Sequence, residues 1–162
     1  YNGRWFLVAA SEKDEKLLTF ALDRIDKVTP LPSHKYVDCD DDISEMYEEI
    51  IGVTYYDDAP LCNIYFWTSD GAKDYVLTKP LHSSQVRVKN IAKNEELRKR
   101  YPTLENGQIF KIVCKFNYEL IRELSSYGKD LMVLEPSSIQ DMVYERVNSM
   151  FEDYSKVRTK NS

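Results

Sequence analysis

The sequence predicts an α+β fold, and three patterns lead to this prediction. Runs rich in aromatic and β-branched residues, typical of strands, alternate with amphipathic stretches that have the period of a helix. Two apolar runs near the start of the chain are joined by a charged turn, which indicates an antiparallel hairpin. From residue 60 onward the predicted elements follow the order βαββαβ, which is typical of a ferredoxin-like sandwich with two helices on one face of an antiparallel sheet.

The predicted hairpin consists of residues 5–10 and 17–22, with the charged turn 11–16 between them. Side chains of both parities in residues 5–10 are apolar, so we expect this strand to be buried on both sides. Asn2-Gly3 is a turn signal in its own right, and almost no chain precedes it. We therefore expect the hairpin to pair with an upstream strand that lies outside this sequence.

An acidic helix is predicted to follow the hairpin. Residues 38–49 carry seven acidic side chains and no basic one, with Asp42 placed as the N-cap and Gly52 beyond the last turn. The acidic face is either solvated or a contact for a partner, and solvation is the commoner case. The turn-rich stretch 54–60 marks a boundary, so the predicted organisation is an N-terminal unit at 1–36, a linker at 37–59 and a domain at 60–162.

The predicted domain has strands at 61–68, 84–89, 108–116 and 129–134, and helices at 70–79, 94–100 and 117–128. Asp70 and Asn117 stand as N-caps of two of these helices. An extra C-terminal helix begins near Pro136, with Ser137 and Gln140 spaced as a capping box. Its apolar side chains form one stripe, which favours packing on the sheet or on a neighbour over a methionine-rich ligand surface. The stripe consists of Ile139, Met142, Val143, Val147, Met150, Phe151 and Tyr154.

Composition excludes several classes of protein. The 162 residues are 43% apolar and include 27 acidic and 22 basic side chains, so the chain is globular and lacks the overall basic charge of a DNA-coating protein. The three cysteines, Cys39, Cys62 and Cys114, form no CxxC pair, which indicates reduced thiols and a cytoplasmic location. No apolar run is long enough to span a membrane, so no membrane association is expected.

No catalytic, cofactor or metal motif is found. His34 and His82 are the only histidines and have no metal-ligand spacing, and glycine-rich phosphate loops are absent, so we expect neither a metal nor a cofactor. His82 is followed by Ser83 and Ser84, a pairing of a base with hydroxyls. Adjacent strand residues point to opposite faces and no orienting acid is nearby, so this stretch does not predict an enzyme.

One face of the predicted sheet combines aromatic and basic side chains. If the more apolar parity of each strand faces the helices, the opposite face carries Tyr65, Trp67, Arg87, Lys89, Lys111 and Lys115. Aromatic rings among cations form the kind of platform that stacks and holds single-stranded nucleic acid. The alternative is that the final helix or a second subunit covers this face, because Trp67 with Val113 could seat an apolar stripe.

Two segments carry a family resemblance. NGRWFLVA at residues 2–9, followed by TFALDRI at 19–25, resembles the latter half of a WYL domain, an Sm-like (SH3-type) β-barrel found behind winged-helix domains in bacterial transcription regulators. Residues 42–156, with KPLHSSQVRV and LMVLEPSSI, resemble the C-terminal extension (WCX) domain that accompanies it. The namesake tripeptide is Trp5-Phe6-Leu7, with phenylalanine in place of tyrosine, and Ala21 stands where the family often has arginine, while Asp23-Arg24-Ile25 matches.

The resemblance implies a truncated Sm-like barrel followed by the extension domain, and a function in sensing an effector. The effector would be single-stranded DNA or RNA, a nucleotide or another anion, bound by Arg24 with weaker contacts from Arg4 and Tyr1. The chain would then control promoter binding by an N-terminal winged-helix domain that is absent here, as part of a homodimer. The alternative is a purely structural dimerisation module with no ligand of its own.

Overall fold

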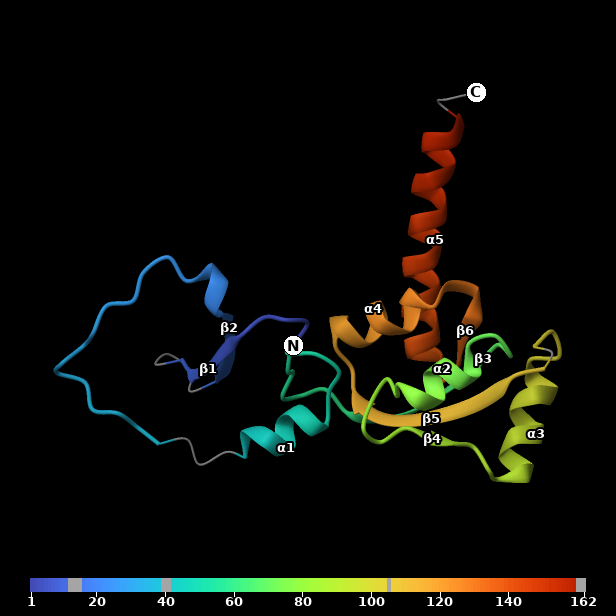
Figure 1. The fold of residues 1–162 in the computed structure, drawn as a ribbon, viewed down its shortest axis with the longest axis horizontal. Helices are drawn as coiled ribbons and strands as arrows, with labels where there is room; N and C mark the ends of the chain where they lie inside the picture. Colours follow the sequence, from blue (N-terminus) through green and yellow to red (C-terminus); the bar gives the residue numbers. More distant parts are fainter. Residues whose placement is uncertain (12–15, 39–41, 105, 160–162) are drawn as a thin grey trace.

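The computed structural model describes residues 1–11, 16–38, 42–104 and 106–159, and these form a mixed α+β structure with two antiparallel sheets (Figure 1). The strands are β1 (Phe6–Ala10), β2 (Leu17–Ala21), β3 (Leu61–Thr68), β4 (Val86–Arg87), β5 (Gln108–Lys115) and β6 (Leu131–Glu135). The α-helices are α1 (Ile43–Glu48), α2 (Lys73–Thr78), α3 (Ile91–Arg100), α4 (Tyr118–Ser126) and α5 (Ser137–Thr159), with short 3-10 turns η1 (Leu22–Arg24) and η2 (Gly128–Asp130). The α+β prediction is therefore confirmed at the level of fold class. No helix in the described part of the chain is long and apolar enough to cross a bilayer.

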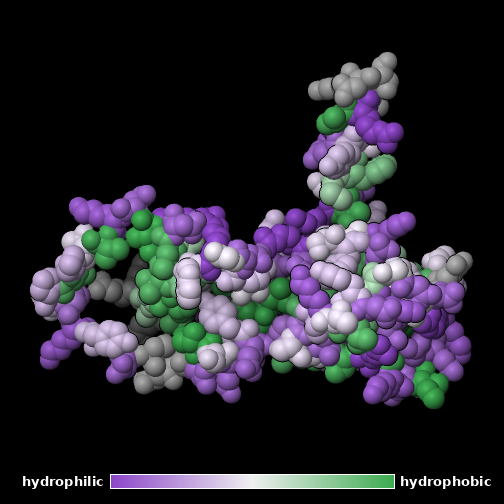
Figure 2. Space-filling model, viewed as in Figure 1, coloured by the Kyte–Doolittle hydropathy of each residue, from purple (hydrophilic) through white to green (hydrophobic). Residues whose placement is uncertain are grey.

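The predicted hairpin forms as β1 and β2, paired antiparallel with Leu7 opposite Phe20. Residues 12–15 of the predicted turn, like Cys39, lie outside the described residues. The expectation that the first strand is buried on both sides is wrong, because Leu7 is exposed and Trp5, just before β1, is 81% exposed. Figure 2 shows hydrophobic residues gathered over this part of the molecule. The described residues form a two-stranded sheet here and no closed barrel.

The larger sheet has the strand order β4-β5-β3-β6, and every neighbouring pair is antiparallel. β3 and β5 form as predicted and pair along their whole length, from Leu61 opposite Lys115 to Thr68 opposite Gln108. The predicted strand at 84–89 is wrong in extent, because only two residues of it are β-strand. The Ser84 hydroxyl takes the place of strand pairing there, since it accepts from the Val113 N–H at 2.8 Å and donates to the Val113 carbonyl at 3.1 Å.

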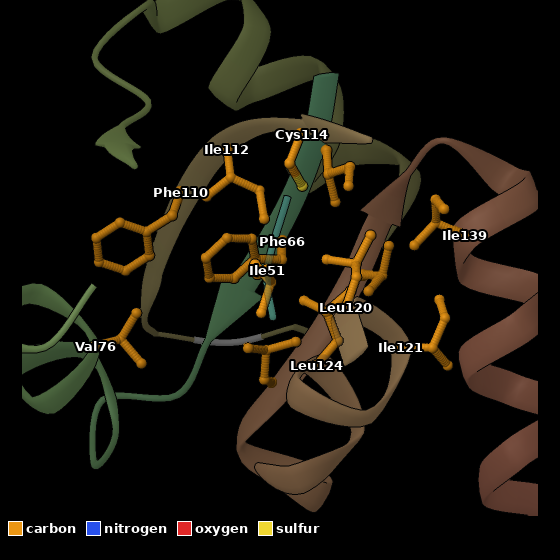
Figure 3. Close-up of a cluster of buried hydrophobic side chains, with 13 residues drawn as sticks. Ile51, Phe66, Val76, Phe110, Ile112, Cys114, Leu120, Ile121, Leu124 and Ile139 are labelled. Atoms are coloured by element: carbon orange, nitrogen blue, oxygen red, sulfur yellow. The ribbon is translucent and has the colours of Figure 1, made fainter. Parts of the chain in front are cut away.

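The main core lies on one face of this sheet, under α2, α4 and the start of α5 (Figure 3). At its centre the rings of Phe66 and Phe110, opposite each other on β3 and β5, stack with centroids 5.6 Å apart. Side chains from the helices close over them: Val76, Leu120, Ile121, Leu124 and Ile139. Ile51 is part of the same cluster, so the residues after α1 pack as a component of this unit.

α3 covers part of the other face of the sheet. Leu97 of α3 is fully buried against Trp67, Ile109 and Leu134. The sequence left open whether the final helix or a second subunit covers this face; within the described chain the helix between β4 and β5 covers part of it, and the final helix does not. α5 instead leaves the sheet after its first turns and projects from the body (Figure 1). Within its apolar stripe Ile139 is buried, whereas Met150 and Phe151 are exposed.

Three of the helix starts follow capping chemistry. Asp42 caps α1 by accepting from two backbone N–H groups, Asn90 caps α3, and Asn117 caps α4 through Leu120. The predicted cap Asp70 is wrong: α2 begins at Lys73, whose ammonium group pairs with Asp70 at 2.7 Å. The predicted capping box of α5 is also wrong: Ser137 is already the first helical residue, and the Gln140 side chain donates instead to the Val133 carbonyl at 2.9 Å, which ties the helix to β6.

Candidate ligand-binding groove

A groove of about 1140 Å³ lies between the hairpin and the larger unit. Three segments distant in sequence form it: the hairpin with its flanking residues, the turn after α1, and the first turns of α4. Its polar and aromatic lining includes Tyr1, Arg4, Lys16, Arg24, Tyr55, Tyr56, Asp57, Asp58, Tyr118, Glu119 and Arg122. The groove therefore brings together Arg24, Arg4 and Tyr1, the three contacts that the family resemblance implied.

Arg4 is held in the groove wall by Asp23. Its guanidinium pairs with both carboxylate oxygens, with Nε 3.2 Å from Oδ1 and Nη2 against Oδ2. The contact raises the pKa of Arg4 and lowers the pKa of Asp23, in both cases chiefly through the side-chain hydrogen bond. This two-point geometry fixes the plane of the guanidinium, while the carboxylate offsets its charge. Arg4 therefore presents its N–H donors in a fixed orientation, and Asp23 offsets its positive charge.

Arg24 and Arg122 supply cations at two sides of the groove. Arg24 is exposed at the end of η1, and within the described residues it makes no hydrogen bond or salt bridge. Arg122 projects from α4 and donates to the Tyr1 hydroxyl at 3.1 Å, which links the larger unit to the start of the chain. One guanidinium presents five N–H donors, so a single bond to Tyr1 leaves Arg122 able to bind an anion as well.

Tyr55 lines the groove from the turn after α1, and Lys115 holds it in place. The Lys115 ammonium contacts the Tyr55 hydroxyl, lies 4.3 Å from the ring centroid, and pairs with Glu49 at 2.9 Å. These contacts raise the pKa of Lys115, with the Tyr55 hydrogen bond as the largest cause, and lower the pKa of Glu49 through its bond to Lys115. Lys115 was predicted on the sheet platform, but the structure commits it to this ion pair and ring contact.

The turn at 51–54 is fastened to the start of α4. The Asn117 amide donates to the carbonyls of Ile51 and Thr54 at 2.8 and 2.9 Å. Thr54 in turn donates from its hydroxyl to Oε1 of Glu119 at 2.9 Å. Glu119 is only 7% exposed, and its Oε2 is buried with no hydrogen-bond partner in the part of the chain that the structure describes. These bonds make the turn and α4 one rigid wall of the groove.

The remaining predicted site residues lie on the larger sheet, away from the groove lining. Trp67 is 9% exposed beneath α3 and so offers no face for stacking. Tyr65 is half-buried, with the ammonium groups of Lys93 and Lys111 at 5.0 and 6.0 Å from its ring centroid. Arg87 and Lys89 are exposed at the edge of the sheet. The expected six-residue platform is therefore interrupted at Trp67 and Lys115.

His82 and Ser84 do lie close together, with Nδ1 and Oγ 2.7 Å apart. The Ser84 hydroxyl is occupied by both backbone groups of Val113, and burial lowers the pKa of the histidine. The pair therefore joins β5 to the segment before β4. Across the described ranges, no cluster of three or more His, Cys, Asp or Glu side chains could hold a metal ion.

Sequence reasoning missed Arg122, Tyr55 and Tyr118 as groove residues. Each belongs to a segment more than 25 residues away from the hairpin, and only the folded chain brings them into the same groove as Arg24. The 12 tyrosines of the sequence were a general sign of a surface suited to binding, without indicating a location.

Comparison with known proteins bears on the hairpin side of the groove. No curated protein matches the chain. The family model of the WYL domain matches residues 1–30, a range that contains β1, β2, η1 and with them Tyr1, Arg4 and Arg24. The hairpin that forms one wall of the groove is thus similar to a WYL domain, which is generally found in regulators that sense ligands.

Proposed function

We propose that this chain is the effector-sensing region of a transcription regulator and that the groove binds an anionic ligand, a nucleotide or a short single strand of nucleic acid. The observation that carries the proposal is the meeting of Arg24 and Arg122 with several tyrosines in one groove, whose hairpin wall matches the WYL domain. Guanidinium groups bind phosphate with two parallel N–H bonds, and tyrosine rings stack on bases. The chain acts by binding, without catalysis.

The charge distribution in the groove suits a ligand with one anionic end. Asp23 offsets Arg4, and Asp57 and Asp58 add negative charge to the lining near Tyr56. A phosphate would therefore be attracted to Arg24 and Arg122 and repelled by Asp57 and Asp58. The tyrosines of the lining would contact the uncharged part of the ligand.

The larger unit supports a second part of the proposal. Read from β6, its strand order is β6-β3-β5-β4, all antiparallel, with α2 and α4 packed on one face. A ferredoxin-like arrangement has this order, so we assign residues 60–162 to that fold and to the extension domain that the sequence resembles. In this assignment the groove lies where effector binding can change how the two units meet. An attached winged-helix domain would then convey the change to promoter DNA.

The test is fluorescence anisotropy with a labelled single-stranded oligonucleotide of about ten nucleotides, at two salt concentrations. Wild-type protein should bind saturably, and the double variant Arg24→Gln/Arg122→Gln should bind at least about tenfold more weakly with a shallower salt dependence. Arg87→Gln is the matched control, because it removes an exposed arginine from the sheet edge and should leave binding unchanged. An equal loss of affinity in the double variant and in Arg87→Gln would place the binding site on the sheet instead of in the groove. Binding that neither variant changes would overturn the assignment of the groove, and no binding of the oligonucleotide would exclude a nucleic-acid strand as the ligand.

A further inference from the structure

One wall of the groove holds a carboxylate oxygen that has no hydrogen-bond donor. Glu119 lines the groove and is 7% exposed. Its Oε1 accepts from the Thr54 hydroxyl at 2.9 Å, whereas its Oε2 is buried and meets no donor among the described residues. A buried carboxylate oxygen without a donor is costly, because nothing replaces the water that it has lost. The folded chain therefore has an acceptor here for which it supplies no partner.

The chain also holds this carboxylate in place without neutralising it. The backbone of Gly52 packs against the methylene groups of Glu119, and the Asn117 amide fastens the same turn through the carbonyls of Ile51 and Thr54. Arg122 lies one turn further along α4, but its guanidinium donates to the Tyr1 hydroxyl at 3.1 Å instead. The carboxylate is thus positioned by packing, and its negative charge is left for a donor from outside the chain.

We propose that Glu119 recognises the base of a bound nucleotide and selects guanine. This inference rests on the proposed function, since it takes the ligand to be a nucleotide whose phosphate lies at Arg24 and Arg122. Guanine carries two adjacent N–H donors, at N1 and at the 2-amino group, and one carboxylate accepts from both. Oε2 is free for one donor, and Oε1 keeps a second lone pair beside its bond from Thr54. The last torsion of a glutamate side chain is soft, so the carboxylate can turn to meet the base.

The other bases present the wrong pattern to a carboxylate. Adenine has an acceptor at N1 beside its 6-amino donor, and cytosine has an acceptor at N3 beside its 4-amino donor. Uracil has a single N–H between two carbonyl oxygens. Each of these bases sets an acceptor against a carboxylate oxygen, and neither atom can then find a donor. Glu119 therefore discriminates by the polar groups that a wrong base leaves unpaired.

Tyr56 supplies a surface for the base beside this acceptor. It lines the groove, is 42% exposed, and is held by a stacked contact with Phe116 at 6.4 Å between ring centroids. Bases of any kind stack on such a ring, so Tyr56 adds affinity and Glu119 adds selectivity. Arg122 follows Glu119 by three residues and therefore lies on the same side of α4. The wall thus offers an acceptor for the base and a cation for the phosphate one helical turn apart.

The test is calorimetric titration of the whole chain with guanosine, inosine and adenosine monophosphates. The guanosine nucleotide should bind at least about tenfold more tightly than the adenosine nucleotide, and the inosine nucleotide, which lacks only the 2-amino group, should lie between them. Glu119→Gln keeps the shape of the side chain but replaces one acceptor by an amide donor, so it should remove this preference. Glu123→Gln is the matched control, because it makes the same charge change on α4 at a residue outside the described groove lining. It should leave the preference unchanged.

The variant Arg24→Gln/Arg122→Gln separates this inference from the proposed function. It should weaken the guanosine and adenosine nucleotides alike and leave the ratio of their affinities unchanged, because it removes phosphate contacts only. Arginine-dependent binding with equal affinities for the two nucleotides would overturn the role of Glu119 and leave the proposed function standing. A preference for guanine that Glu119→Gln retains would overturn that role as well. So would the absence of binding by all three nucleotides at about 1 mM, whatever the oligonucleotide titration shows.

Discussion

Gly52 lies directly against the side chain of Glu119. A Cβ atom added to Gly52 would be 2.6 Å from Cγ of Glu119. Gly52 also has a φ of +97°, a backbone angle that residues with a side chain rarely adopt. The contact presses the turn after α1 onto the start of α4, and both segments line the groove. The shape of the groove wall therefore depends on a residue with no side chain.

Gly52→Ala should destabilise the chain by about 2 to 4 kcal/mol, from the left-handed backbone and the clash with Glu119 together. Thermal unfolding measures the loss. Gly128→Ala is the control, because Gly128 also has a positive φ of +56° but its added Cβ would meet nothing within 4 Å. It should cost only about 1 to 2 kcal/mol. Equal losses in the two variants would mean that Gly52 is kept for its backbone alone.

Asn117→Ala should be among the most destabilising polar substitutions, at about 2 to 4 kcal/mol. It removes the cap of α4 and leaves the carbonyls of Ile51 and Thr54 without their donor in a buried site. Asn90→Ala removes only the cap of α3, in an exposed position, and should cost about 1 kcal/mol. Urea unfolding of both variants compares them. A loss at Asn117 no greater than that at Asn90 would show that the two carbonyl bonds contribute nothing.

The Glu49–Lys115 pair should make stability depend on pH at both ends of the range. The pKa of Glu49 is lowered in the folded chain, so its contribution is present above its ordinary value near 4.5 and is lost as pH falls through the lower folded value. The pKa of Lys115 is raised above 10.5, so its contribution is present below that pH and is lost as pH rises through the folded value. Melting temperatures of wild type and Glu49→Gln should differ at pH 7 and converge in acid. A difference that persists unchanged at pH 3 would contradict this account.

Cys114 should resist thiol reagents while the chain is folded. Burial raises its pKa to about 12, so almost no thiolate is present at pH 8. Alkylation followed by mass spectrometry of the peptide containing Cys114 should show no modification in native buffer and full modification in urea. Cys62, directly opposite on β3, is half-buried and free, and serves as the comparison within the same sample. Rapid modification of native Cys114 would mean that the sheet opens readily near its Lys115 end.

The sequence predicted those elements whose signal is local. β3 and β5 were found because alternating aromatic and β-branched residues specify a strand wherever it pairs, and α4 because Asn117 both caps it and begins its apolar period. β4 and the start of α2 were mispredicted because, in each case, a side-chain contact took the place of the strand pairing or the helix cap that the sequence pattern predicted. Ser84 took over the backbone of Val113, and Asp70 paired with Lys73 instead of capping.

The candidate site was predictable on one side only. Arg24, Arg4 and Tyr1 followed from the resemblance of the first residues to the WYL domain, which the family match at 1–30 supports. Arg122 and Tyr55 could not be inferred, because their place in the groove depends on how the larger unit meets the hairpin. Trp67 was predicted to stack on a ligand because of its parity on β3, but parity does not reveal that α3 packs over that face.

The Ser84 bridge also bears on how the protein behaves at high concentration. On the side of β5 that faces away from β3, the backbone groups are already hydrogen-bonded. Ile109 bonds to Val88, and Lys111 pairs with β4. Val113 bonds to the Ser84 hydroxyl, and the Lys115 N–H donates to the Glu49 carbonyl at 2.7 Å. A foreign strand adding at this edge would find only the two residues of β4 to pair with. The sheet is thereby protected on this side against edge-to-edge assembly and fibril growth.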